Sequence, residues 1–392
     1  MTNQPSSAVG RIHVSRTVSS LVLGVGFGLT GAGTVMLGVL LPVLSQKWGI
    51  GDDAAGFLFF LQFLGSALGA VFTGMNRVRA LVVGYGLLLL SAGVLAFVGL
   101  RLAFPVFFFW GLGLGMAMTA TSLLFSDRYG DDRAAKLERL NFAWAAGATA
   151  APMLFMPFLR MPSLRPLFFT FQGLFLLLFV WVVLRERQEA PAEQLKVGGA
   201  GAGSQAPLRA LLPLVVLAVC AIGVESSLSG WLASYSHRAD PQGAAGAAFA
   251  TSLFWFGIVL SRLAFSTRLL AITGRRRLLG AALVCVAASV ALLVAAHHPV
   301  PIRLAAALAG LCIGPLYPLL LSFLLERSPR GWIFAVAGLG SVLFPWLTGV
   351  LSAHYGSLRF GLIAPCFAAV LMILLFPVAL GPAAMPAVTN TR

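Results

Sequence analysis

Of the 12 Asp and Glu residues in this 392-residue chain, only Glu225 lies well inside an apolar stretch. A charged side chain at the centre of a bilayer costs about 3 kcal/mol on insertion scales, so it is retained where it faces a cavity or a partner. Serines follow Glu225, and Gly223 and Gly230 flank it, a composition typical of a helix that bends or breaks beside a binding site. Glu225 is therefore a candidate for carrying a coupling proton. The alternative is a structural carboxylate that pairs with an arginine or caps the helix end.

Arg262 is the one basic residue inside an apolar stretch, and Trp255 lies seven positions earlier on the same face of the expected helix. The guanidinium group could pair with Glu225 or bind a solute hydroxyl. Alternatively, its long side chain could snorkel to the membrane surface near Arg268. Both alternatives stay open at this point.

Asn141 and Trp144 share one face of another expected helix. An amide beside an indole suits a sugar ring, because the amide bonds hydroxyl groups and the indole stacks on the apolar C–H face. The alternative is that Asn141 caps its helix. Further polar residues, Thr34, Gln62 and Tyr317, lie in otherwise apolar stretches and are expected to face the interior, as contacts between helices or with a solute.

The composition indicates which elements must position these side chains. The chain is 59% hydrophobic and 10% charged, with a mean hydropathy of +0.93, which excludes an ordinary soluble enzyme. A membrane-spanning helix needs about 20 apolar residues. The sequence predicts twelve such helices, at 19–45, 53–75, 79–100, 103–126, 133–158, 163–184, 209–236, 243–267, 277–297, 302–325, 331–353 and 358–380. Paired glycines inside them, such as Gly65 with Gly69 and Gly111 with Gly115, predict close helix contacts.

The basic residues predict the orientation of the helices. With the N-terminus in the cytoplasm, nineteen of the 27 Lys and Arg residues fall in cytoplasmic segments. This is the positive-inside bias, and it predicts a multi-pass protein of the bacterial inner membrane with both termini cytoplasmic. Because the basic residues are not pooled in one patch, the net charge of +15 does not indicate nucleic acid binding. The histidines and cysteines show no metal-ligand spacing, and no cofactor or metal is expected.

The helices are expected to form two six-helix domains, at 1–184 and 209–392, joined by a flexible cytoplasmic linker at 185–208 whose centre is rich in Gly and Ser. A basic loop recurs at matching places, Gly74–Arg79 after the second helix and Gly274–Arg277 after the eighth. Paired halves of this kind are typical of transporters that alternate access by rocking one half against the other.

Twelve spans, a central linker and these basic loops resemble the major facilitator superfamily. The stretches Asn141–Pro152, Gly223–Leu232 and Gly314–Pro318 resemble motifs of its fucose:proton symporter family. That resemblance implies a proton-coupled sugar transporter with Glu225, Asn141 and Trp231 near the site. One departure is that the first and fourth helices lack the acidic residues common in that family, so coupling rests on Glu225 or is absent.

These patterns predict a secondary transporter, not an enzyme, that moves a small hydroxylated solute, a monosaccharide. The transporter is expected to be a monomer surrounded by membrane lipid, and its coupling ion is expected to be a proton or sodium. The solute-binding residues are predicted to be Thr34, Gln62, Asn141, Trp144, Trp231, Trp255, Arg262 and Tyr317. Two alternatives remain: a translocator of lipids or hydrophobic drugs with the same fold, and a membrane receptor or scaffold that does not transport.

Overall fold

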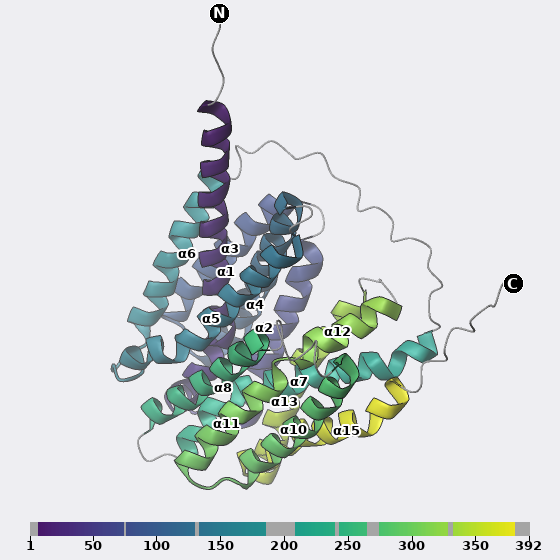
Figure 1. The fold of residues 1–392 in the computed structure, drawn as a ribbon. Coiled ribbons are helices and arrows are strands. Elements are labelled where there is room, and N and C mark those ends of the chain that lie inside the picture. Colours follow the sequence, from purple (N-terminus) through teal and green to yellow (C-terminus); the bar gives the residue numbers. More distant parts are fainter. Residues whose placement is uncertain are drawn as a thin grey trace, which may run out of the picture.

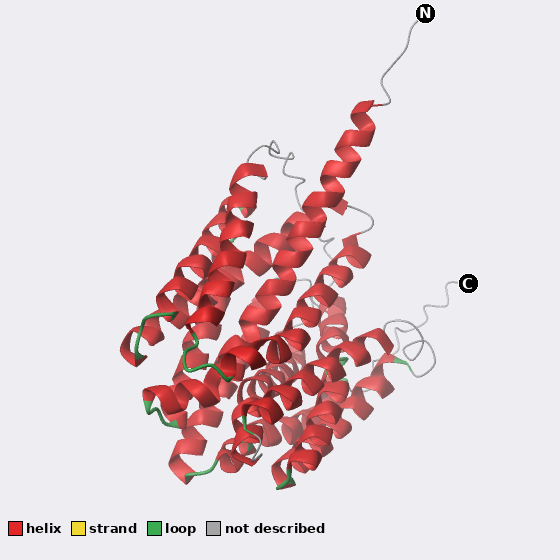
Figure 2. Cartoon of the chain, turned by 90° about the vertical axis from the view of Figure 1, so that its left-hand side faces the viewer, coloured by secondary structure: helices red, strands yellow, loops and turns green. Residues whose placement is uncertain are grey.

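A computed structural model describes residues 7–73, 76–129, 133–185, 208–239, 243–264, 274–327 and 332–380. All regular structure in these ranges is helical (Figure 2). Among these described residues, twelve helices are long and apolar enough to cross a membrane, which confirms the predicted fold class of an all-α membrane protein. The predicted linker at 185–208 falls almost wholly outside the described residues.

Six helices of the N-terminal half form one bundle, and the helices of the C-terminal half form a second (Figure 1). The first bundle contains α1 (Ser7–Trp48), α2 (Asp52–Phe72), α3 (Arg77–Leu95), α4 (Leu100–Tyr129), α5 (Arg133–Leu159) and α6 (Arg165–Arg185). The second contains α7 (Leu208–Ala239), α8 (Ala244–Ala264), α10 (Arg275–Ala295), α11 (Pro299–Ile313), α12 (Leu316–Arg327), α13 (Trp332–Tyr355), α14 (Leu358–Gly361) and α15 (Ile363–Ala379). The domain boundaries at 184 and 209 stay a prediction.

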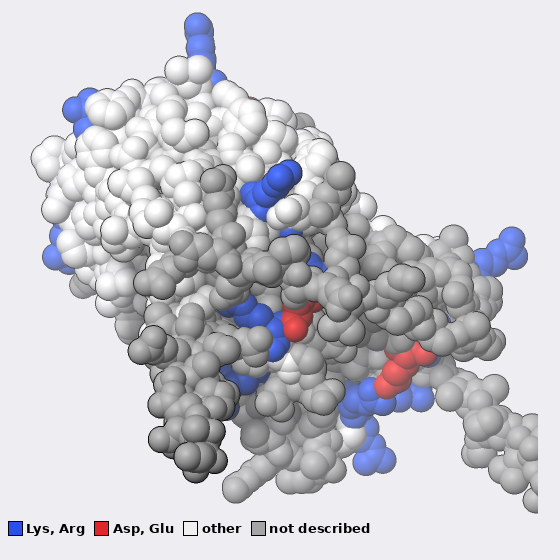
Figure 3. All heavy atoms as spheres, turned by 90° about the horizontal axis from the view of Figure 1, so that it is seen from above, with Lys and Arg blue, Asp and Glu red and all other residues white. Residues whose placement is uncertain are grey.

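In Figure 1 the N-terminal bundle lies at the upper left and the C-terminal bundle at the lower right; they meet at the left and diverge toward the upper right, the side of the two termini. We call that side the proximal end. The opposite side, the distal end, includes residues 46–52, 96–99, 160–164, 236–239, 296–298 and 356–357. Seen from the proximal side, basic side chains outnumber acidic ones among the described residues in view (Figure 3).

Three helices differ from the predictions. Helix α1 begins at Ser7 rather than near residue 19, and its first turns project beyond the bundle (Figures 1 and 2). Helix α7 runs unbroken from Leu208 to Ala239, so the break expected around Glu225 is absent there. The tenth span breaks instead, between α11 and α12. Pro315 and Pro318 explain this break, because neither has a backbone N–H to donate to the preceding turn.

Glycines set the closest contacts within the N-terminal half, as their spacing predicted. A Cβ added to Gly111 of α4 would lie 1.9 Å from the carbonyl oxygen of Gln62 in α2, and one on Gly65 would lie 2.1 Å from that of Phe108. Only glycine allows backbones to approach so closely. The glycines thus lie at close helix contacts, as their spacing predicted, and the structure adds that α2 and α4 are the partners.

The same contact recurs in the C-terminal half. A Cβ on Gly310 of α11 would lie 1.9 Å from the carbonyl oxygen of Phe254 in α8, and one on Gly257 would lie 2.5 Å from that of Ala307. The third helix of each half also begins with a matching ion pair at the proximal end. These pairs are Arg77 with Asp127 and Arg275 with Glu326. The internal repeat thus extends from the basic loops into the packing of the helices.

Candidate functional site

Glu225, Arg262 and Tyr317 form an electrostatic cluster inside the C-terminal half. The carboxylate of Glu225 interacts with the guanidinium group of Arg262, and the phenol of Tyr317 interacts with both charges. These side chains come from three separate helices, α7, α8 and α12. The pairing of Glu225 with Arg262, one of the open alternatives, is therefore supported by their proximity.

The break between α11 and α12 helps to hold Arg262. The Nε atom of Arg262 lies 3.5 Å from the carbonyl oxygen of Gly314, at the limit of a hydrogen bond. In a regular helix this carbonyl would accept from the N–H of residue 318, but Pro318 has none. The broken helix thus supplies an acceptor for Arg262 at the depth of the cluster. Its side chain is oriented toward the interior by this contact rather than free to extend to the surface.

Trp144 and Trp255 meet across the two halves. Their ring centroids lie 5.3 Å apart with an edge-to-face geometry of 74°. Both Nε1 atoms are buried and have no hydrogen-bond partner among the described residues, and Trp255 is only 2% exposed. Buried polar groups are nearly always paired. Two buried N–H groups without a partner at one contact therefore mark a place where a solute oxygen could accept hydrogen bonds.

Thr34 and Gln62 lie in the N-terminal half, where Gln62 of α2 bonds to α1 and the Thr34 hydroxyl bonds within α1. The Nε2 atom of Gln62 donates to the carbonyl oxygen of Thr34 at 3.0 Å, and the Thr34 hydroxyl donates to the carbonyl oxygen of Thr30 at 2.8 Å. The Oε1 atom of Gln62 is buried without a partner among the described residues. These two residues thus stabilise the α1–α2 contact and leave one acceptor unused.

Asn141 is exposed on α5, one turn from Trp144. Helix α5 begins at Arg133, so Asn141 lies inside the helix and the capping alternative is wrong. No described contact joins Asn141 to the Glu225 cluster, and its role in binding stays a prediction.

Trp231 lies in the seam between the halves, apart from the cluster. Its Nε1 atom donates to the carbonyl oxygen of Pro345 at 2.8 Å, and its ring packs 5.6 Å from that of Phe59. The side chain is fully buried. Its polar atom is satisfied within the protein, so the structure gives Trp231 a packing role, and its contact with a solute stays a prediction.

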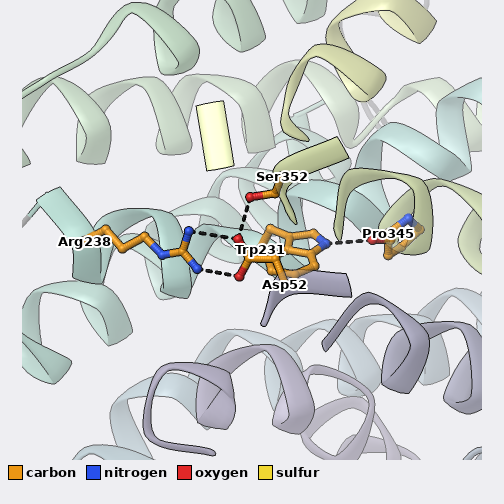
Figure 4. Close-up of polar contacts among 5 residues, drawn as sticks. All are labelled: Asp52, Trp231, Arg238, Pro345 and Ser352. Atoms are coloured by element: carbon orange, nitrogen blue, oxygen red, sulfur yellow. Dashed lines mark hydrogen bonds and ion pairs between the residues drawn. The ribbon is translucent and has the colours of Figure 1, made fainter. Parts of the chain in front are cut away.

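Sequence reasoning missed a polar network at the distal end, drawn in Figure 4. Asp52 of α2 receives two hydrogen bonds from Arg238 of α7, at 2.9 and 2.5 Å, and one from Ser352 of α13 at 2.5 Å. Asp52 looked like an ordinary loop or helix-end carboxylate, because its partners lie 186 and 300 residues away. The sequence signal that could have found this network is the pair of acidic residues, Asp52 and Asp53, in the first turn of α2.

Among the residues that the structure describes, no three His, Cys, Asp or Glu side chains are placed to hold a metal ion. The groups that this arrangement offers for binding are a carboxyl group near a guanidinium group, a phenol, two indole donors and an amide acceptor, distributed over both halves.

Solved structures of transporters share this fold. A bacterial homolog of the human lysosomal transporter Spinster, in an inward-facing and occupied conformation, is 13% identical with a TM-score of 0.69, covering 93% of this chain and 96% of that one. The peptide transporter POT, in complex with alafosfalin, is 16% identical with a TM-score of 0.71, covering 92% and 94%. The nucleoside transporter NupG is 12% identical with a TM-score of 0.69, covering 91% and 98%.

At these identities the likeness shows the fold alone, and the sequence has no match among curated proteins. The family model of the Major Facilitator Superfamily matches residues 23–330, which is most of the chain. This match agrees with the two bundles, the twelve candidate spans and the recurring glycine contacts. The chain therefore belongs to the major facilitator superfamily.

Proposed function

We propose that this transporter moves a small hydroxylated solute, a monosaccharide, by alternating access between its two halves. The observation that carries the proposal is the pair of orphan indole donors, Trp144 and Trp255, at the contact between the halves. Aromatic rings with free N–H groups suit a sugar, because the ring covers a C–H face while the donor meets a hydroxyl oxygen. The resemblance of three segments to fucose:proton symporters supports the same solute class.

Glu225 is the proposed site of the coupling ion, either a proton or sodium. It is the only carboxylate well inside a membrane span among the described residues, and Arg262 faces it. In this scheme Arg262 and Tyr317 hold Glu225 when it is charged, and binding of the coupling ion releases Arg262 toward the solute.

In the proposed arrangement, the domains at 1–184 and 209–392 rock about the linker at 185–208, in a monomer. The protein lies in the bacterial inner membrane with the proximal end and both termini in the cytoplasm. The excess of basic side chains on the proximal face supports this orientation (Figure 3).

A ligand panel read by thermal shift tests the solute class, because a bound solute stabilises the folded state according to its occupancy. We expect at least one hexose or pentose to raise the unfolding temperature. We also expect Trp144→Phe and Trp255→Phe, which keep an aromatic ring and remove the donor, to weaken that binding by roughly tenfold each. Trp181→Phe, a change in α6 outside the contact between the halves, is the matched control.

Uptake into proteoliposomes tests the mechanism. Uptake of the stabilising sugar should depend on a pH or sodium gradient, and Glu225→Gln should abolish that dependence. A flat response to all sugars together with scrambling of labelled lipid would instead favour the lipid or drug translocator. Saturable binding without transport would favour a receptor.

A further inference from the structure

At the distal end one carboxylate bonds across the two halves, and Gln46 of α1 also lies 3.4 Å from His237 of α7 there. Asp52 belongs to α2 of the N-terminal half, and both of its partners belong to the C-terminal half (Figure 4). Arg238 bonds both carboxylate oxygens, a two-point geometry that fixes orientation as well as distance. Ser352 donates to one of the same oxygens from α13. The Asp52 side chain is 12% exposed and that of Arg238 is 47% exposed, so the carboxylate is shielded from water while the guanidinium group is partly open to it.

The backbone around this network is packed at glycines. A Cβ on Gly38 of α1 would lie 2.8 Å from the carbonyl oxygen of Gly230 in α7. A Cβ on Gly349 of α13 would lie 2.4 Å from the carbonyl oxygen of Asp52 itself and 2.8 Å from Cα of Gly56. The carboxylate therefore lies where α2 and α13 approach most closely, and the helices cannot separate there without breaking its bonds.

The C-terminal partners are themselves held in register. Trp231, on the same helix as Arg238, donates to the carbonyl oxygen of Pro345, on the same helix as Ser352 (Figure 4). Helices α7 and α13 thus present Arg238 and Ser352 as one preformed set of donors for the Asp52 carboxylate. Preorganised donors strengthen a contact because little freedom is lost when it forms.

The ion pairs described at the proximal end have a different arrangement. Arg77 with Asp127 and Arg275 with Glu326 each join helices of one half. Those pairs persist when the halves move as bodies, whereas the Asp52 network must form and break with each movement.

From this contrast we propose that Asp52, Arg238 and Ser352 form a latch that holds the distal end closed and sets the balance between the two access states. Opening of the distal end breaks three hydrogen bonds to Asp52 at once. Because of the latch, the state with a closed distal end is the resting state. Solute binding has to offset the free energy lost when these hydrogen bonds break, so that the transport cycle can proceed. This proposal depends on the family fold and on these contacts, and it holds whatever the solute is.

Access to a buried cysteine measures the distal opening directly. Ser234 is 4% exposed and lies between Gly230 and Arg238 at a spacing of four residues, on the side of α7 that meets the N-terminal half. With the four native cysteines replaced by alanine, Ser234→Cys should react with a small maleimide in proteoliposomes only when the distal end opens. Its labelling rate then reports the open population.

We expect Asp52→Asn and Arg238→Gln each to raise this rate by roughly tenfold, since hydrogen bonds to charged groups contribute most among polar contacts. Ser352→Ala, which keeps the ion pair, should raise it by about threefold. The exchange Asp52→Arg with Arg238→Asp should return the rate toward that of the parent, because the pair is restored with its ends reversed.

Two controls separate opening from general damage. Arg359→Gln removes another distal arginine, whose bonds to Ala296 and His297 stay within the C-terminal half, and it should leave the rate unchanged. A second reporter, Ser289→Cys, lies fully buried within α10 and reacts only when the fold itself loosens.

Unchanged labelling of Ser234→Cys in both Asp52→Asn and Arg238→Gln would overturn the latch. Equal acceleration at both reporters would overturn it as well, since the change would then be unfolding. If the charge variants do not fold, Ser352→Ala decides alone: faster labelling at Ser234→Cys but not at Ser289→Cys supports the latch, and an unchanged rate overturns it. None of these readings uses a sugar, so they are independent of the proposed solute.

Discussion

The two halves of this transporter pack alike and differ in charge. Gly111 against Gln62 in the N-terminal half has its counterpart in Gly310 against Phe254 in the C-terminal half. A second pair repeats as well: a Cβ on Gly147 of α5 would lie 1.9 Å from a carbonyl oxygen of α1, and one on Gly340 of α13 would lie 2.1 Å from one of α7. Close helix contacts are thus shared by both halves.

The interior charges have no such counterpart. In the register of these contacts, Ala70 corresponds to Arg262 and Met118 to Tyr317. The polar groups Thr34 and Gln62 of the N-terminal half use their donors in bonds within that half. Repeated packing preserves the bundle because glycine contacts determine backbone distances. The chemistry of the interior depends instead on single side chains, which can change in one half alone.

The largest effect is expected from breaking the charge pair of the C-terminal half. Glu225→Gln leaves Arg262 without its counter-charge inside a membrane span, and loss of one partner of a buried pair costs roughly 3 kcal/mol. We therefore expect a clear fall in unfolding temperature for Glu225→Gln, and a recovery of most of it in the double variant Glu225→Gln with Arg262→Gln.

A double-mutant cycle measures this coupling directly. Gln62→Leu, which removes an uncharged polar group at a comparable depth in the other half, is the control and should cost less. Additive effects of the two charge changes would show that Arg262 depends on the Gly314 carbonyl rather than on Glu225.

A smaller effect tests whether the packing is truly shared. Gly111→Ala and Gly310→Ala each place a Cβ 1.9 Å from a backbone oxygen, and such overpacking costs about 1 to 3 kcal/mol. We expect both variants to lower the unfolding temperature by similar amounts. Gly173→Ala in α6 has open space around the added Cβ and should be neutral or slightly stabilising. A large fall in unfolding temperature for only one of the two variants would show that the two glycine contacts have the same geometry but contribute unequally to stability.

The smallest effect is expected at the proximal ion pairs. The side chains of Arg77 and Asp127 are 34% and 42% exposed, and those of Arg275 and Glu326 are 43% and 51% exposed. Exposed pairs contribute less than about 1 kcal/mol, and salt screens them further. Arg77→Gln and Arg275→Gln should therefore shift thermal unfolding only slightly, and less so at high salt. A shift as large as that of the glycine variants would contradict this reading.

The sequence by itself determined the twelve spans, the two-part organisation and the residues of the cluster. Hydrophobic runs of about 20 residues must cross the bilayer because unpaired backbone groups are too costly there. An isolated Glu225 or Arg262 is conspicuous in such a run for the same reason. Close helix contacts at Gly65 and Gly111 also followed from glycine spacing, which is a local property.

Only the tertiary structure decided which helix breaks and which side chains meet. Gly223 and Gly230 do not break α7, because glycine permits a break without requiring one. The tenth span breaks instead at Pro315 and Pro318, which remove two backbone donors within four residues. The partners of Asp52 could not be read from the sequence, because they lie 186 and 300 positions away and depend on how two bundles dock. Local preferences act over a few residues, and the contact between the halves is formed only when the whole chain has folded.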